Sequence, residues 1–274
     1  MRITRSRIIQ SMTLLIGASF AGTASSATLA DLGFSPEQIR AITAQANAPA
    51  TSPGIAFGSP VGFGAGWGVI GFGIAGQTTT NAQDDVDGSA TVSFGLGDPT
   101  KWVGLQTDVN LISLQNDFGG DGTVNFKLHT ILPGRSAVSV GVERAVKWGD
   151  AEKDPDENVY AVMTKIFSLN PSNPTNTVPL AINIGVGDGR FESNDNDGVG
   201  LFGGITLIPH QQISIITDWS GQALNAALSF VPFRRVPVSL TLGALNVTER
   251  DVNENDNQEP STEFSGTIAY SVRF

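Results

Sequence analysis

The chain has 274 residues, of which only 15% are charged, and its formal net charge of −10 does not suit the phosphates of a nucleic acid. It contains no cysteine, which excludes disulfides, thiolate metal sites and a cysteine nucleophile. After the N-terminus, no stretch has the roughly 20 consecutive apolar residues of a membrane-spanning helix.

Residues 1–27 have the pattern of a secretory signal peptide. A start with three arginines is followed by a mostly apolar run. Ser25 and Ala27 then supply the small residues that cleavage requires. We therefore expect the protein to be exported and leave this segment out of the fold.

Residues 28–60 are predicted to form a periplasmic lead-in with one short helix. Ser35 is a suitable N-cap, Pro36 suits the first helical position, and Gln38 completes a capping box. The helix either remains in the lead-in or forms a small plug in the mouth of the next domain. That domain is expected to span residues 61–274.

From Trp67 onward the hydrophobic period changes to two, which is the period of a β-strand. Val138, Val140 and Val142, for example, alternate with polar or small residues. About twelve segments have this pattern, and they are near the 9–11 residues of a tilted membrane strand. These segments are residues 67–77, 90–96, 103–111, 124–129, 138–143, 159–167, 180–186, 200–208, 213–219, 224–230, 238–243 and 263–274.

The connections between these segments alternate in length and charge. Short turns are expected at residues 97–101, 132–136, 169–176, 209–211 and 231–237. The other connections are mostly longer and hold most of the 26 acidic residues, with a tight neutral joint at 220–222 as the exception. Short turns at one end and long loops at the other are typical of a transmembrane barrel. A soluble secreted β-sandwich is kept as an alternative, but it would not need this sorting.

The last segment is apolar on one face, which carries Phe264, Gly266, Ile268, Tyr270, Val272 and Phe274. This ending resembles the C-terminal signal strand of bacterial outer-membrane β-barrels. Together with the signal peptide, the strand period and the alternating loops, it resembles that superfamily over nearly all of the mature chain. The resemblance implies that the barrel-assembly machinery reads a signal formed by Ile268, Tyr270, Val272 and Phe274.

A narrower resemblance rests on four stretches. These are FGLGDP (94–99), KLHTILPG (127–134), GVGDGRF (185–191) and DWSGQALNAALSFVPF (218–233). They are similar to stretches of uncharacterised cyanobacterial barrel proteins. This similarity implies no catalytic residue.

We therefore predict an all-β fold, a transmembrane antiparallel up-and-down β-barrel of about 12 strands with a short N-terminal helix. It is expected in the outer membrane, surrounded by lipid. The residues expected to line its lumen are Asp108, Asn125, Lys127, His129, Glu143, Lys165, Asp218 and Arg273. The hairpin register is expected to bring Asp108 opposite Lys127 or His129. In the less regular segment 159–167, Tyr160, Val162 and Ile166 are expected to point outward.

Candidate catalytic and cofactor sites are weak, and we expect no enzyme activity and no cofactor. His129 has Asp108 within reach, but no nucleophile accompanies them. Asp195 and Asp197 have the spacing of a calcium loop, yet the first and twelfth ligands are missing. Loose binding of divalent cations by the acidic loops stays an alternative. The glycine-rich run 62–76 lacks the helix that a nucleotide site needs.

Two functions fit this fold. The first is a passive channel for small polar or charged solutes, because charged side chains around a pore set its selectivity. The second is a non-conducting structural or envelope/polysaccharide-assembly barrel. Eight-stranded barrels are filled by side chains and much larger ones are open, so twelve strands lie between these cases. Inward glycine, alanine and serine favour open space, whereas the opposed charges favour a filled interior.

Overall fold

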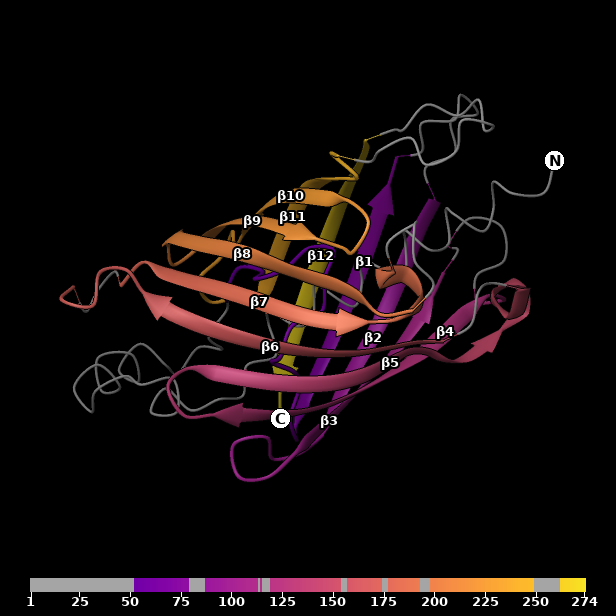
Figure 1. The fold of residues 1–274 in the computed structure, drawn as a ribbon, viewed down its shortest axis with the longest axis horizontal. Helices are drawn as coiled ribbons and strands as arrows, with labels where there is room; N and C mark the ends of the chain where they lie inside the picture. The colour runs from indigo at the N-terminus through magenta and orange to yellow at the C-terminus, as the bar shows by residue number, and fades with distance from the viewer. Residues whose placement is uncertain are drawn as a thin grey trace.

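The computed structural model describes residues 52–78, 87–112, 114, 119–153, 157–173, 177–192, 198–248 and 262–274. In these residues, twelve antiparallel strands close into one barrel, in which each strand pairs with its sequence neighbours and β12 pairs with β1 (Figure 1). The predicted all-β antiparallel barrel of about 12 strands is therefore confirmed. No helix within the described ranges is long and apolar enough to cross a membrane.

The strands follow one another around the wall in chain order. They are β1 (Val69–Gln77), β2 (Asp87–Gly97), β3 (Gly104–Leu111), β4 (Gly122–Leu132), β5 (Ser136–Trp148), β6 (Asn158–Ser168), β7 (Pro179–Gly187), β8 (Gly200–His210), β9 (Ile213–Trp219), β10 (Leu224–Phe230), β11 (Val238–Leu245) and β12 (Glu263–Arg273). Two short 3-10 helices, η1 (Gly149–Lys153) and η2 (Gly189–Phe191), follow β5 and β7.

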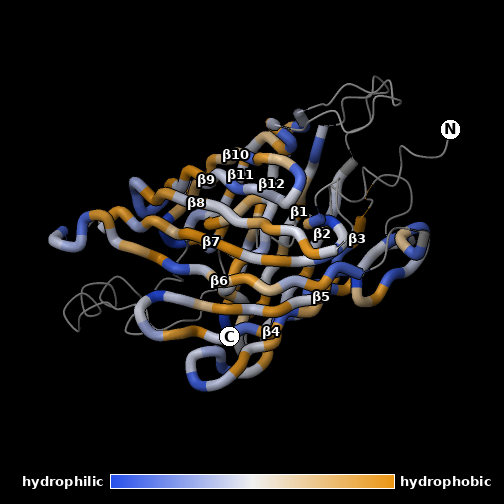
Figure 2. The backbone as a smooth tube through the Cα atoms, viewed as in Figure 1, coloured by the Kyte–Doolittle hydropathy of each residue, from blue (hydrophilic) through white to orange (hydrophobic). Residues whose placement is uncertain are grey.

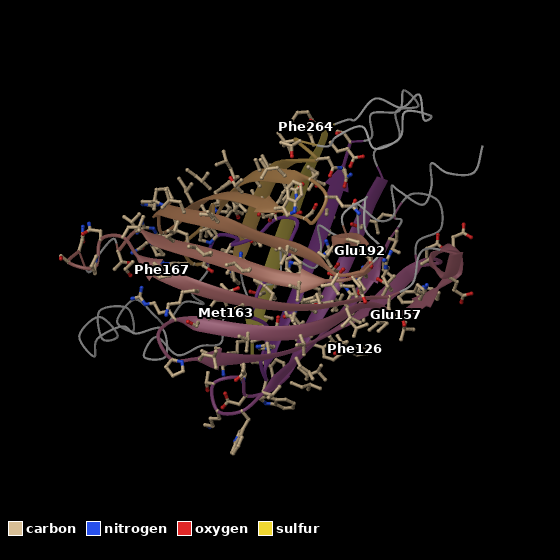
Figure 3. All side chains as sticks on the ribbon, viewed as in Figure 1. Phe126, Glu157, Met163, Phe167, Glu192 and Phe264 are labelled. Carbon is tan, nitrogen blue, oxygen red and sulfur yellow. The ribbon has the colours of Figure 1, made fainter. Side chains whose placement is uncertain are left out.

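Side chains alternate between the interior and the outer surface of the barrel, because successive residues of a strand point to opposite faces. On β10, Leu228 is 55% exposed whereas the neighbouring Ser229 is fully buried. Figure 2 shows the apolar residues as orange bands along the strands. In Figure 3, the side chains of Phe126, Met163 and Phe167 lie on the outer surface, and all three are exposed. The barrel is thus apolar outside and largely polar inside.

The two ends of the barrel differ. Short turns join β2 to β3, β4 to β5, β6 to β7, β8 to β9 and β10 to β11 at one end, which we call the short-turn rim. The other end, which we call the long-loop rim, carries the remaining connections. Residues 79–86, 113, 115–118, 154–156, 193–197 and 249–261 of those connections lie outside the described residues. The strand bounds match the predicted sorting in most places, but the β6–β7 connection is as long as the β3–β4 connection, and the β9–β10 joint is tight, as predicted.

The closing pair of strands joins the two ends of the wall. β1 and β12 pair along their whole length, from Val69 opposite Arg273 to Gln77 opposite Ser265. The N–H of Phe274 also donates to the carbonyl oxygen of Gly68, at 2.9 Å. The last residues of the chain are therefore part of the closure, which leaves no free sheet edge in the wall.

The register between β3 and β4 differs from the prediction. Asp108 lies opposite Asn125, and Lys127 lies opposite Gln106, because pairing continues as far as Leu111 and Gly122 at the long-loop rim. The expected pairing of Asp108 with Lys127 or His129 was therefore wrong.

An irregularity in β5 adds a charge to the interior. Between Val124 and Phe126 of β4, the pairing with β5 shifts, and Arg144 has a positive φ of 59°. Such a bulge breaks the strict alternation of faces. As a result, the consecutive residues Glu143 and Arg144 are both buried.

Residues 54–66, which we call the inner segment, lie inside the barrel rather than in its wall. Their indigo trace runs within the ring of strands in Figure 1. All of them are buried. The wall begins only at Val69, so residues 61–66, predicted as the start of the barrel domain, belong to its interior. The predicted signal peptide and N-terminal helix lie outside the described residues.

The inner segment rises through the barrel and returns. Gly54 contacts Ser229, next to the short-turn end of β10. Gly58 contacts Asp218, next to the long-loop end of β9. Ala65 contacts Gln106, close to the short-turn end of β3. The segment therefore enters and leaves on the same side, and its apex lies towards the long-loop rim.

Candidate functional site

The filled interior is the candidate site, and its first part is the rising half of the inner segment. Side chains of β7 to β10 hold the main chain there. The bonds run from Gly54 N to Ser229 Oγ (2.9 Å), from Ser214 Oγ to Gly54 O (2.6 Å), from Thr206 Oγ1 to Ile55 O (2.8 Å) and from Asn183 Nδ2 to Ile55 O (3.4 Å). Four different strands thus bind main-chain atoms of two consecutive residues.

The apex of the inner segment is held by one carboxylate and one guanidinium. Oδ2 of Asp218 accepts the N–H groups of Phe57 and Gly58, both at 2.9 Å. Oδ1 of Asp218 accepts the Asn225 amide, also at 2.9 Å. Nη1 of Arg190 donates to the carbonyl oxygen of Gly58, at 3.2 Å. Bonds to ionised groups are the stronger class, so this apex is the most firmly held point of the segment.

The descending half is bound by β3 to β6. The bonds run from Ser139 Oγ to Val61 O (3.2 Å), from Gly62 N to Thr164 Oγ1 (2.7 Å), from Lys127 Nζ to Phe63 O (2.9 Å), from Ala65 N to Gln106 Oε1 (2.9 Å) and from His129 Nε2 to Ala65 O (3.0 Å). As in the other half, each bond ends on a main-chain atom of the inner segment. The wall therefore recognises the peptide backbone of the segment.

Apolar side chains of the inner segment fill separate hydrophobic clusters. Phe57 is fully buried in a cluster with Ala75, Ile216, Ala227, Leu245 and Ala269. Phe63 and Val61 belong to a second cluster, which includes Ala137 and Ala181 of the wall. The small wall residues give each ring space beside an otherwise polar surface. Burying a Phe side chain contributes about 1.5–3 kcal/mol, so the two rings add to the main-chain bonds in holding the segment.

Glycines allow the segment to approach the wall closely. A Cβ on Gly62 would lie 2.3 Å from the carbonyl oxygen of Ala137, which is a wall backbone atom. A Cβ on Gly64 would lie 2.6 Å from the His129 ring, and one on Gly58 would lie 2.3 Å from the Asn225 amide. The clash at Gly62 is the hardest to relieve because the strand backbone cannot rotate away. Any side chain at position 62 must therefore displace the segment.

A buried ion pair stands beside the apex. Nε and Nη2 of Arg190, from η2, donate to the two carboxylate oxygens of Glu143, at 2.5 and 2.7 Å. The Asn158 amide donates to the same carboxylate at 3.3 Å. The guanidinium also lies over the ring of Phe191, 4.0 Å from its centroid. This bidentate geometry ties η2 to the wall and to the inner segment at once.

Little space remains between these groups. Asp108 accepts the Ser93 hydroxyl and, at 2.8 Å, the Gln106 amide. A cavity of about 10 Å³ lies next to it, lined also by Pro60, Lys127 and Glu143 among others. That volume is about the minimum for a single water molecule. The charged centre of the barrel is therefore closely filled.

The structure brings most of the predicted lumen residues together inside. Asp108, Asn125, Lys127, His129, Glu143 and Asp218 are all buried and point inward. Arg273 is exposed at the short-turn rim, at the end of β12. The predicted assembly-signal residues Ile268, Tyr270, Val272 and Phe274 lie on or near the outer surface of the closing strand.

Lys165 does not line the interior, and the predicted faces of β6 are reversed. Tyr160 and Val162 are buried inside, whereas Met163 and Phe167 are exposed outside. Lys165 shares the outer face, donates to the carbonyl oxygen of Gly134 and lies 5.9 Å from the centroid of the Phe167 ring. β6 has apolar residues on both faces, so hydrophobic periodicity alone could not assign them.

Several functional residues escaped the sequence reasoning. Arg190 follows a strand in what reads as an acidic loop, and Gln106, Thr164 and Ser139 are uncharged wall residues. A signal was present, because residues 61–66 alternate apolar residues with glycine before the first strand. That pattern could have indicated a chain that fits into a narrow space.

Within the described residues, the ring of His129 bonds a main-chain carbonyl and no nucleophile. Because a carbonyl oxygen only accepts, Nε2 of His129 carries the proton that it shares with Ala65. Nδ1 of His129 is buried and has no hydrogen-bond partner. Among the described residues, no group of three or more His, Asp or Glu side chains is placed to hold a metal ion. The bonds of the site are those of a structural or binding surface.

No protein-family model matches the chain, and the search of curated proteins also gave no match.

Proposed function

We propose that the protein is an outer-membrane β-barrel channel for small polar or charged solutes that the inner segment closes at rest. The proposal places the apolar outer surface against lipid and the short-turn rim on the periplasmic side. Solute would pass when the inner segment leaves the interior. Assembly would use the terminal strand, as the resemblance to outer-membrane barrels implies.

The observation that supports a channel is how the inner segment is attached. It forms no strand with the wall, and the hydrogen bonds described above join it to wall side chains. The wall pairs around its full circumference without it. The segment can therefore leave without breaking the barrel, and it would uncover Asp108, Lys127, Glu143 and Asp218. Charged groups around such a passage would select ions and polar solutes.

A non-conducting structural barrel is the second candidate, and the filled centre favours it. The cavity of about 10 Å³ beside Asp108 passes no solute. The Glu143–Arg190 pair is also largely buried, and such pairs are costly unless both partners stay in place. If the inner segment never leaves, the interior serves only to rigidify the wall.

Conductance of a Gly62→Ala variant separates the two candidates. The added methyl group meets the Ala137 carbonyl oxygen, so the segment is displaced while the wall keeps its pairing. The control is Gly266→Ala, since a Cβ at that position on β12 meets only the flexible end of Leu242, at 3.1 Å. Both purified proteins are first tested for the mobility shift between unheated and boiled samples that marks a closed barrel.

The channel proposal expects low conductance of the wild-type protein and of Gly266→Ala in planar bilayers, and clear ion conductance of Gly62→Ala. A folded Gly62→Ala barrel that stays silent would favour the structural barrel. A protein that is fully extracted by aqueous buffer would contradict both candidates.

A further inference from the structure

We infer that the barrel interior is a binding site for a bent peptide that enters and leaves on one side, and that residues 54–66 occupy it as a tethered ligand. The inference rests on the proposed function in one respect, because the inner segment must be able to leave. It goes further in naming the chemical class that the vacated interior recognises. The site is formed by wall side chains of β3 to β10 together with Arg190.

The first argument is the chemistry of the contacts. Acceptors such as Asp218, Thr164 and Gln106 bind peptide N–H groups, and donors such as Lys127 and Ser139 bind peptide carbonyls. Both kinds of main-chain group are matched in each half of the segment. A solute-conducting wall has no need of this matching, whereas a peptide that loses its water does need it.

The second argument is that the wall makes no hydrogen bond to the side chain of Ser59. Ser59 carries the one hydroxyl within residues 54–66, and its Oγ is buried without a hydrogen-bond partner. The wall thus satisfies the main chain at the apex on either side of Ser59 and leaves the side chain unmatched. Recognition of this kind depends little on polar side chains and strongly on a backbone that can follow the bent path of the inner segment.

The third argument is the pair of hydrophobic clusters. The ring of Phe57 fills one and the ring of Phe63 lies in the other, six residues further along the chain. Gly58 and Gly62 between the two rings, and Gly64 directly after Phe63, keep the backbone close to the wall. The expected ligand is therefore a short peptide rich in glycine and small residues that carries apolar or aromatic side chains at two points. An oligosaccharide fits less well, because its hydroxyl groups would be buried unpaired in those clusters.

The test uses full-length Gly62→Ala protein in detergent and a fluorescent synthetic peptide with the sequence of residues 52–66. The tethered segment of this variant cannot seat, so the free peptide should bind saturably, as measured by fluorescence anisotropy. Wild-type protein should bind it at least about tenfold more weakly, since a tethered competitor acts at an effective concentration near millimolar.

Three further ligands make the test specific. A peptide methylated on the main-chain nitrogens of Phe57, Gly58 and Gly62 loses the donors that Asp218 and Thr164 accept, and it should bind at least about tenfold more weakly. A peptide of the same composition in scrambled order should also bind weakly, because its rings no longer match the two clusters. Linear glucose oligosaccharides should not compete.

Equal binding of the methylated peptide, competition by the oligosaccharide, or no binding of the native peptide to the folded variant would each overturn the inference. If Gly62→Ala does not show the mobility shift of a folded barrel, the double variant Phe57→Ala, Phe63→Ala is used instead. It weakens the tethered segment without adding any atom against the wall, and the same results are expected.

Peptide binding and ion conductance test the peptide site and the channel independently. A Gly62→Ala barrel that conducts but binds no peptide supports the channel proposal and overturns the peptide site. A barrel that binds the peptide but does not conduct supports the peptide site and contradicts the channel.

Discussion

Replacing Asp218 by alanine should release the inner segment. One oxygen of this carboxylate accepts the N–H groups of both Phe57 and Gly58. A hydrogen bond to a charged group contributes about 1.5–3 kcal/mol, so the two bonds together contribute about 3–6 kcal/mol to seating the apex. Because 1.4 kcal/mol is a factor of ten, the population with the segment unseated should rise by about a hundredfold to ten-thousandfold.

Hydrogen exchange measured by mass spectrometry gives this population directly. In the wild-type protein, fragments that cover residues 54–66 should exchange slowly. Asp218→Ala should accelerate their exchange by about a hundredfold to ten-thousandfold. Asp218→Asn keeps one acceptor oxygen without the charge and should give an intermediate rate. Fragments from β4 and β5, which do not contact Asp218, should stay protected.

Asn110→Ala is the matched control for this prediction. Asn110 is also buried and inward, but it bonds Thr91 and Thr123 of neighbouring strands rather than the inner segment. Its loss should weaken the wall and leave exchange of residues 54–66 almost unchanged. The reasoning fails if Asn110→Ala releases the segment as strongly as Asp218→Ala, or if the wild-type segment is already unprotected.

Three other predictions concern the wall and its assembly. Glu143→Gln or Arg190→Met alone should lower the free energy of unfolding in detergent by about 3–5 kcal/mol, because each leaves a buried charge unpaired, and the double variant should lose less than the sum. Phe274→Ala should reduce the amount of barrel in outer-membrane fractions, and normal amounts after removal of the last three residues would contradict the assembly signal. Leu128→Arg, on the outer surface of β4, should destabilise the barrel in lipid bilayers by roughly 2–4 kcal/mol, and a neutral effect would mean that this face does not contact acyl chains.

The wall was predictable because its signal is local. Alternation along each strand needs only neighbouring residues, and a single run such as 138–143 already shows which face is apolar. The number of such runs gave the strand count, and the connection lengths gave the two rims. β6 was assigned to the wrong faces because Tyr160 and Val162 look like residues of an outer surface, yet they pack with Phe191 and Phe202 inside.

The contents of the barrel were much less predictable, because their partners are distant in sequence. Gly54 bonds Ser229 across 175 residues, and Phe57 bonds Asp218 across 161. The alternation of residues 61–66 has the period of a strand, so a local rule would place these residues in the wall rather than in the interior. Arg190 illustrates the same limit, since only the closed wall brings it to Glu143. The charged row was foreseen, but its partners turned out to be a peptide backbone and a loop arginine.

The central claim is that the inner segment closes the barrel. Chemical labelling at residue 59 tests it most directly, because Ser59 is fully buried near the apex of the segment. The chain has no cysteine, so a single Ser59→Cys substitution can be labelled without background. A Lys101→Cys variant, in the turn between β2 and β3 where the native side chain is 74% exposed, reports full access. In isolated outer membranes, a hydrophilic maleimide should label the Ser59→Cys variant at least about a hundredfold more slowly than the Lys101→Cys variant, and adding Gly62→Ala to Ser59→Cys should remove that protection. Equal labelling rates for the two single variants would show that the segment does not close the barrel.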